Sequence, residues 1–414
     1  MTGGQIPTGA VPPQGGAGAR SARIRRGCLA SLFGLATVLL GLELGLRLYG
    51  DRERAFQESV NRTNARWVRL MQAGIFEEID DPVRRYAMRP GSEASVDGWL
   101  FRVNSHRARG PEYPLAKPAG EKRLVCIGDS FAFGLWADED ETLVGHLARL
   151  ASEAEQAAGS GIRWRGISLG VPGYHAGQQR RALEQDALRL DPDVVVLYYN
   201  TNDILRDGFF LDEELGALRV DQTPLPVGLR RLLWHSHLYG FLVREVGARS
   251  RSGAASPHLD PDNQAYAAAA IREMAALCRA REVPLFFVNQ PLYTWMGDAR
   301  RPDWWVLPLV QWAEELREEL GLPGYSLLGF LRGYADGVDR LGPGGGGPKE
   351  DFFPDRYIAD EAVQRGFEIY DAGGDPLEEG LVVPEEPDFH LTGEGYGHMA
   401  RLVYPAMREA GLVP

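Results

Sequence analysis

The sequence holds little that would support a metal site, a disulfide framework or a nucleic-acid partner. Among 414 residues there are three cysteines, Cys28, Cys126 and Cys278, and their spacing matches neither a metal knuckle nor a redox pair. Lys and Arg number 45 against 57 Asp and Glu, and this net charge of -12 argues against a basic surface that binds phosphate backbones. We therefore expect no metal, no cofactor and no nucleic acid, and we expect Cys126 and Cys278 to be buried as small apolar residues.

Signatures of nucleotide binding and of zinc are equally scarce. The glycine run from Gly344 to Gly347 lacks the Gly-Lys-Ser/Thr ending of a P-loop. His235 and His237 could be two metal ligands, but no third ligand stands at a recognisable spacing. Catalytic zinc needs three protein ligands, so a structural interpretation of this histidine pair is favoured.

Near the N-terminus, by contrast, stands an apolar stretch over residues 27–49, interrupted by Glu43 and Arg47. It is long enough to span a bilayer if these two side chains reach the far interface or pair with each other. Residues 1–26 are rich in Gly, Pro and Ala, and four arginines precede the apolar stretch. We expect a disordered basic tail over 1–26 and a transmembrane signal anchor over 27–49.

The flanking charges predict the orientation of this anchor. Basic residues before the apolar stretch keep the N-terminus in the cytoplasm, so the rest of the chain would lie on the extracytoplasmic side of the cytoplasmic membrane. A cleaved signal peptide, a lipoprotein and a buried soluble helix are the alternatives. The first lacks a small-x-small site after the stretch, the second lacks a cysteine at its end, and the third would not carry the arginines.

The remaining chain divides into a lead-in segment and one large domain. Residues 50–119 begin with a near-helical apolar spacing and are expected to form a juxtamembrane helix, either a stalk or a segment that folds against the domain. The domain spans 120–414, with irregular insertions at about 206–262 and 331–387 that are lids, binding loops or plain surface excursions.

Within the domain, short apolar runs alternate with helical patterns. Strands are expected over 123–128, 163–170, 193–199 and 284–289, and helices over 141–158, 177–190, 263–281, 304–320 and 396–410. Such alternation predicts a parallel sheet covered by helices on both faces. Ligands bind to such sheets outside the carboxyl ends of the strands.

Two of the chemically interesting residues follow the first two predicted strands. Ser130 comes directly after the first strand, in Ile127-Gly-Asp-Ser-Phe131, where such sheets carry out chemistry, although Gly-Asp-Ser also occurs in plain turns. Gly173 follows the second strand and could let backbone N–H groups face an oxyanion. A Pro-Gly turn is the simpler reading of Gly173 by itself.

Two further blocks follow later in the chain. Asn202 and Asp203 end the third strand, where an amide could donate to the same oxyanion or could cap a helix. Asp388 and His390 stand directly before the last helix, and a carboxylate near a histidine can fix its tautomer and stabilise its charged form. Alternatively, they form a loop histidine with a capping acid. Thr392 is expected to cap the last helix.

Together the four blocks resemble the SGNH (GDSL) hydrolase family over roughly residues 120–410, in what looks like a membrane-anchored bacterial branch. The resemblance implies a flavodoxin-like three-layer α/β/α sandwich with a parallel sheet. It also implies that Ser130 is the nucleophile, His390 the general base and Asp388 the orienting acid. The oxyanion hole would combine the N–H groups of Ser130 and Gly173 with the Asn202 side chain, with Asp129 and Asp203 in support.

The sequence departs from the family pattern at one point. Most members carry Asp three residues before the histidine, whereas here position 387 is Pro and Asp388 lies two residues before His390. Glu386 is the alternative orienting acid.

The implied function is a serine esterase acting on an ester-linked group, in particular an O-acetyl group of an envelope polysaccharide. An O-acyltransferase onto a glycan would use the same residues, so the sequence does not separate the two. A non-catalytic glycan-binding or assembly module on the same fold is the rival of a different class. The presence of Ser130, Asn202 and His390 together argues against that rival.

Overall fold

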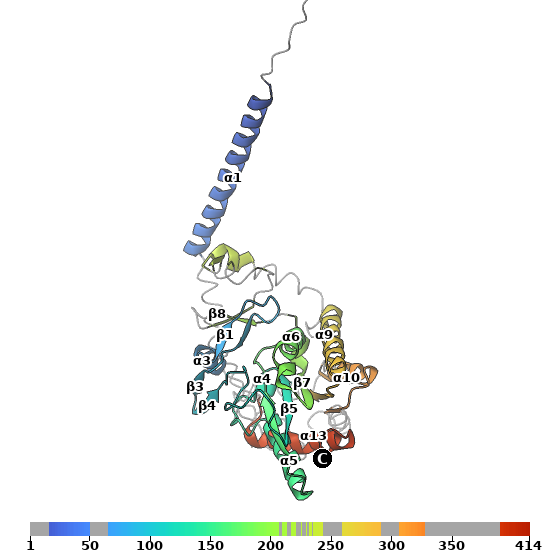
Figure 1. Ribbon diagram of the computed structural model, residues 1–414. Coiled ribbons are helices and arrows are strands. Elements are labelled where there is room, and N and C mark those ends of the chain that lie inside the picture. The colour runs from blue at the N-terminus through green and yellow to red at the C-terminus, as the bar shows by residue number, and fades with distance from the viewer. Residues whose placement is uncertain are drawn as a thin grey trace, which may run out of the picture.

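A five-stranded parallel sheet forms the centre of the domain (Figure 1). The computed structural model describes residues 16–49, 65–206, 209–212, 217–220, 259–290, 306–327 and 390–414, with shorter stretches between 225 and 242. All neighbouring strands of the sheet are parallel, in the order β11-β10-β7-β5-β6. The strands are β5 (Glu121–Gly128), β6 (Arg163–Ser168), β7 (Val194–Asn200), β10 (Leu285–Gln290) and β11 (Gly324–Ser326).

The central strands form because their side chains can be buried on both faces. All seven residues of β7 are buried, and its run of three valines suits a pleated strand. In β5, Val125 and Ile127 enter one apolar cluster, while Leu124 and Cys126 enter the other. This alternation assigns the two faces of the sheet. The predicted burial of Cys126 and Cys278 is confirmed.

Helices cover both faces. Leu183 and Met274 belong to the cluster of Val125, whereas Leu147 and Val403 belong to the cluster of Leu124. The three-layer α/β/α architecture is therefore confirmed, and most helix bounds lie within two or three residues of the predicted ones. The covering helices are α6 (Ala176–Gln185) and α9 (Pro261–Ala280) on one face, α5 (Leu143–Ala157) and α13 (Gly393–Glu409) on the other, and α10 (Val306–Glu319), which contributes to both clusters.

The order of the strands fixes where a ligand can bind. Counted along the chain, the sheet strands lie in the order 2-1-3-4-5, which is the flavodoxin-like arrangement. The order reverses between β5 and β7, and sheets of this kind bind ligands at the carboxyl ends of the strands beside that reversal. The short helix α4 (Ser130–Phe133) follows β5, and the 3-10 helix η2 (Thr201–Ile204) follows β7.

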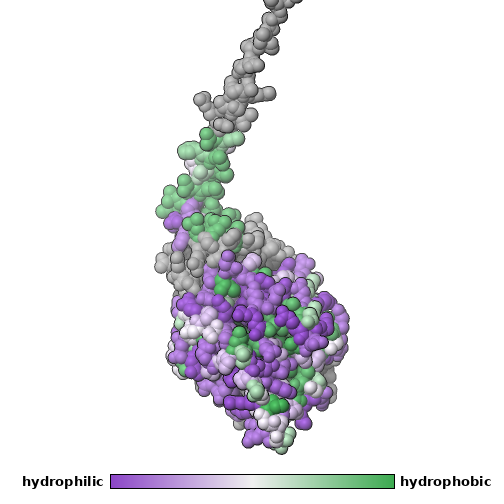
Figure 2. All heavy atoms as spheres, viewed as in Figure 1, coloured by the Kyte–Doolittle hydropathy of each residue, from purple (hydrophilic) through white to green (hydrophobic). Residues whose placement is uncertain are grey.

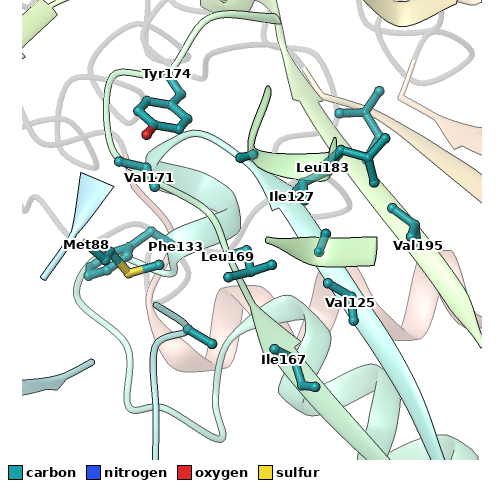
Figure 3. Close-up of a cluster of buried hydrophobic side chains, with 14 of the residues drawn as sticks. Met88, Val125, Ile127, Phe133, Ile167, Leu169, Val171, Tyr174, Leu183 and Val195 are labelled. Atoms are coloured by element: carbon teal, nitrogen blue, oxygen red, sulfur yellow. The ribbon is translucent and has the colours of Figure 1, made fainter. Parts of the chain in front are cut away.

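The lead-in segment packs into the domain. Leu70, Met88 and Phe101 share one apolar cluster with Phe133 and Leu169 of the sheet region. Figure 3 shows Met88 against Phe133. Residues 65–119 therefore fold against the domain, and the packing is continuous across the predicted boundary at residue 120. The segment contains α3 (Ala65–Gln72) and two antiparallel hairpins, β1 (Phe76–Glu78) with β2 (Tyr86–Met88) and β3 (Glu93–Val96) with β4 (Trp99–Arg102).

The two predicted insertions are described only in part. The first contains an antiparallel hairpin of β8 (Phe209–Asp212) and β9 (Ala217–Val220). The second, 331–387, lies outside the described residues. The end of the predicted helix over 177–190 is a separate 3-10 turn, η1 (Ala187–Leu190).

The N-terminal helix α1 (Gly16–Tyr49) starts earlier than predicted. Residues 16–26 are helical and correct the prediction of disorder there, because Ala and Arg favour helix and a helix already nucleated extends readily. Cys28–Leu48 is long and apolar enough to cross a membrane, and none of it is buried against the domain. Glu43 and Arg47 pair at 2.7 Å, which was one of the two arrangements expected.

Candidate active site

Ser130 occupies a tight turn at the carboxyl end of β5. Asp129 caps α4 by accepting a hydrogen bond from the N–H of Phe131 at 2.9 Å, and Ser130 is the first residue of that helix. Gly128 precedes them, and a Cβ at this position would lie 2.5 Å from the carbonyl oxygen of Tyr198 in β7. Only glycine allows this close approach of backbone. The turn therefore presents Ser130 beside the reversal of strand order.

His390 reaches Ser130 from the far end of the sequence. Its Nε2 lies 2.7 Å from Ser130 Oγ, and its ring centroid lies 4.9 Å from that of Phe131. A second contact of Ser130 Oγ, 3.5 Å from Asp129 Oδ2, is much longer. A serine and a histidine at this distance can exchange a proton.

The position of His390 depends on the packing of α13 against α5. Thr392 caps α13 as predicted, by accepting a hydrogen bond from the N–H of Gly395 at 3.1 Å. His146 of α5 places its Nε2 2.9 Å from the carbonyl oxygen of Gly393. The two helices can approach closely because Gly397 has no Cβ. A Cβ at this position would lie 3.0 Å from the His146 ring.

The predicted orienting acids cannot be compared with this geometry. Asp388 and the alternative Glu386 both lie outside the described residues. Their roles stay predictions.

Gly173 lies in the loop between β6 and α6, with a backbone φ of +77°. The loop is tied to the nucleophile turn, because the N–H of Val171 donates to the carbonyl oxygen of Gly128 at 3.1 Å. His175, two residues on, is buried and caps α6 by accepting from the N–H of Gly177 at 3.1 Å. Burial lowers the pKa of His175 to about 3, so this histidine remains neutral.

Asn202 follows β7 in a buried polar turn. The N–H of Asn200 donates to Asp203 Oδ2 at 2.9 Å, and Asn200 Oδ1 accepts from the N–H of Asn202 at 3.5 Å. These bonds form a capping box, so the helix-cap interpretation holds for Asn200 and Asp203. They leave the half-buried Asn202 side chain to face Asp129, whose carboxylate it stabilises.

Asp129 and Asp203 form a buried carboxyl pair. Both are completely inaccessible to solvent. Burial raises the pKa of Asp203 well above its usual range, and the negative charge of Asp129 raises it further. Burial also raises the pKa of Asp129, but the Phe131 N–H, the nearby His390 and the Asn202 side chain oppose that shift. Both carboxyls therefore bind a proton more tightly than an exposed aspartate does.

Arg109, from the lead-in segment, is hydrogen-bonded to the backbone that directly follows the turn of Ser130. Its guanidinium donates to the carbonyl oxygen of Phe133 at 2.8 Å and to that of Ala137 at 2.5 Å. It also donates to the carbonyl oxygen of Gly134. The same group lies 5.0 Å from the ring of Phe101 and 4.9 Å from that of Phe133. Burial lowers the pKa of Arg109 to about 10, so it stays charged at neutral pH and stabilises the carbonyls that end α4.

A second clamp from the lead-in segment holds the loop of Gly173. Tyr86 donates its hydroxyl to the carbonyl oxygen of Pro172 at 2.5 Å, and Tyr174 donates its own to the carbonyl oxygen of Tyr86. The two rings meet edge to face at 5.3 Å. Arg84 Nε donates to Tyr174 Oη at 3.1 Å, and its Nη1 pairs with Asp186 at 2.7 Å.

Sequence reasoning missed both clamps. Arg109 and Arg84 stand in a segment that carries no recognisable motif, and each acts through contacts more than 20 residues distant in sequence. A single sequence contains no signal that would have indicated them. Among the described residues, no cluster of three or more His, Cys, Asp or Glu could hold a metal ion.

The first prediction concerns the clamp on the nucleophile turn. Arg109→Met should lower the free energy of unfolding by about 1–3 kcal/mol for each buried carbonyl that loses its donor. Arg102→Met is the matched control, because Arg102 pairs with Glu139 at 2.6 Å on the half-exposed surface of β4 and should change stability by about 1 kcal/mol or less. Chemical denaturation of the detergent-solubilised chain measures both. Equal losses in the two variants would contradict the clamp.

The second prediction concerns the proton on Asp203. The unfolded chain releases that proton near the ordinary pKa of 3.8, whereas the folded chain retains it to a higher pH. Its contribution to stability is thus complete below pH 3.8 and declines as pH rises towards the folded pKa. Asp203→Asn stays neutral, so its stability relative to wild type should rise with pH, by up to about 1.4 kcal/mol per unit. A difference independent of pH between 4 and 8 (about the range accessible to both proteins) would show that Asp203 is ionised in the folded chain.

Comparison with known proteins identifies a family for the chain. The sequence model of the GDSL-like Lipase/Acylhydrolase family matches residues 126–398. A search among curated proteins finds no match.

Solved structures of a lipase/acylhydrolase and of an acetyl xylan esterase are also similar to the chain. A lipase/acylhydrolase from Enterococcus faecalis is 15% identical, with 71% of this chain and 97% of that chain covered and a TM-score of 0.36. A variant of an acetyl xylan esterase from Geobacillus stearothermophilus is 14% identical, with 73% and 99% covered and a TM-score of 0.36. At such scores the assignment rests on the family match, which covers more than half of the chain. The chain belongs to the GDSL-like lipase/acylhydrolase family and is a hydrolase that acts on ester bonds.

Proposed function

We propose that Ser130 is the nucleophile and His390 the general base of this esterase. The observation that carries the proposal is the 2.7 Å distance between Ser130 Oγ and His390 Nε2. Serine is a weak nucleophile at neutral pH unless a base within hydrogen-bond reach takes its proton. His390 is the histidine that contacts Ser130, whereas the buried His175 is committed to its helix cap.

The reaction follows in two balanced steps. As Ser130 Oγ attacks the ester carbonyl carbon, its proton passes to His390 Nε2. The tetrahedral intermediate collapses, the bond to the alcohol oxygen breaks, and His390 returns the proton to that oxygen. Water then attacks the acyl-enzyme, gives its proton to His390 and releases the acid, and Ser130 recovers its proton.

Three donors are proposed for the oxyanion of the intermediate. They are the N–H groups of Ser130 and Gly173 and the side-chain amide of Asn202. Support comes from the link between the turns, since Val171 of the Gly173 loop is bonded to Gly128 beside Ser130. Each such donor typically contributes ~2.7–4 kcal/mol to lowering the barrier.

The acid that orients His390 is proposed to be Asp388, with Glu386 as its alternative. A carboxylate on the second ring nitrogen would fix the tautomer in which Nε2 accepts the serine proton. Asp129 is buried within electrostatic reach of His390, so its ionised form would stabilise the imidazolium that forms during each proton transfer.

For substrate and location we propose an O-acetyl group of an envelope polysaccharide and a single-pass anchor with the domain on the extracytoplasmic side. Support for the anchor comes from the exposed apolar span of α1 and the arginines before it. A sugar hydroxyl could replace water in the second step, which would make the enzyme an O-acyltransferase. Acetate release with and without an acceptor glycan distinguishes these outcomes.

The third prediction tests the nucleophile. Ser130→Ala should reduce the hydrolysis of p-nitrophenyl acetate by about 10⁴-fold or more, because the chemical step loses its attacking atom. Ser95→Ala is the matched control, since Ser95 is an exposed serine of β3, and it should hydrolyse the ester at the wild-type rate. Comparable rates for wild type and folded Ser130→Ala would remove Ser130 from the reaction.

A further inference from the structure

A carboxylate inside the apolar span of α1 is hydrogen-bonded by a distant part of the chain. The oxygens of Glu43 accept bonds from Ser236 Oγ at 2.7 Å and from the backbone N–H groups of His237 at 3.1 Å and Leu238 at 2.9 Å. One turn on, Arg47 donates to the carbonyl oxygen of His235 at 2.9 Å. The span is thus joined to residues 235–238 by four hydrogen bonds.

The segment around these residues exposes large apolar side chains. Leu232 is 70% exposed and Leu242 49% exposed, and Leu229 is also exposed. In Figure 1 this segment, in yellow-green, lies across the lower end of α1. Figure 2 shows apolar surface there, next to the apolar surface of α1. Single exposed leucines are common, but several within 14 residues beside an apolar span indicate a contact surface.

The position of Glu43 places this segment near one end of the span. Glu43 lies five residues before Leu48, the end of the apolar span. At a rise of about 1.5 Å per residue, this places the Glu43 backbone about 7–8 Å inside that end. Residues 236–238 donate to its carboxylate, so they lie close to the end of the span. Amphipathic helices in a membrane interface bury their apolar faces about 5–10 Å deep.

The charge of the segment fits the same partner. In the sequence, residues 229–242 include Arg230 and Arg231 and contain no Asp or Glu, in a chain whose net charge is -12. The segment also includes Trp234, a residue type enriched at membrane interfaces. A stretch of chain that combines basic and apolar residues favours anionic lipid headgroups.

We propose that residues 235–242, together with the exposed Leu229 and Leu232, form a second membrane contact, which lies in the bilayer interface and is docked on α1 through Glu43. The partner is the surface of a bilayer that contains anionic lipid. The proposal rests on the membrane anchor proposed above and is independent of the esterase chemistry. A segment held at two adjoining places in the membrane would fix the orientation of the domain relative to the bilayer.

The test measures lipid contact at single labelled positions in the full-length protein. Cys28→Ser removes the exposed cysteine, and the other two are buried. Leu232→Cys and Leu242→Cys carry an environment-sensitive fluorophore, with Leu39→Cys in α1 to report the anchor. Leu100→Cys is the matched control, because Leu100 is an exposed leucine of β4, and the label β4 lies well away from α1 in Figure 1. The protein is reconstituted in phosphatidylcholine–phosphatidylglycerol vesicles with spin-labelled lipids.

We expect spin-labelled lipids to quench the probes at 39, 232 and 242 severalfold more than the probe at 100. Quenching at 39 with none at 232 and 242 would overturn the second contact and leave the anchor intact. Absence of quenching at 39 would overturn both. Ester hydrolysis by the same preparations is a separate readout, and its loss would bear on the catalytic proposal alone.

Glu43→Ala tests the docking. Without the carboxylate, the bonds to residues 236–238 are lost, so quenching at 232 should fall while quenching at 39 is retained. Glu43→Gln keeps one acceptor oxygen and should give an intermediate loss. Unchanged quenching at 232 in Glu43→Ala would show that Glu43 does not position the segment.

Discussion

The contact of Ser130 with His390 joins residues that are 260 positions apart, and the candidate chemistry depends on it. Neither residue could reach the other from its local structure alone. Ser130 is held at the carboxyl end of β5, where Gly128 packs directly on β7. His390 stands just before α13, whose place is set by α5 through His146. The two residues meet because Ser130 follows the carboxyl end of β5, whereas His390 precedes α13, which packs on one face of the sheet.

The lead-in segment is part of the same construction. Arg109 fastens the carbonyls behind Ser130, and Tyr86 fastens the loop of Gly173. A donor to an oxyanion is effective only when its position is fixed before the reaction. Residues 65–119 thus fix the turn of Ser130 and the loop of Gly173 relative to the carboxyl ends of the strands. These residues are therefore part of the domain and would not act as a stalk.

Much of the sheet could be predicted from the sequence, because strands such as β7 bury every residue and therefore appear in the sequence as continuous apolar runs. The residues at strand ends, Ser130 and Asn202, could be proposed from the sequence because their types and places are unusual together, and their roles stay predictions. Strand order was not readable from periodicity, and β11 was missed because it has only three residues. The clamps were missed since a buried arginine such as Arg109 is indistinguishable in sequence from a surface one.

The sequence also posed a question that only tertiary contacts answer. Glu43 interrupts an apolar stretch, and its partners at residues 236–238 lie far along the chain. A charged group inside a membrane span is costly unless it is paired and hydrogen-bonded. Both conditions hold here, so the interruption is compatible with a span.

The most direct measurement is the identification of the residue that a fluorophosphonate modifies in the full-length protein, by peptide mass spectrometry. We expect a single adduct on Ser130, and we expect its rate of formation to fall sharply in His390→Gln, which cannot accept the serine proton. An adduct on a different residue, or an undiminished rate in a folded His390→Gln variant, would contradict the pairing on which the proposed mechanism depends.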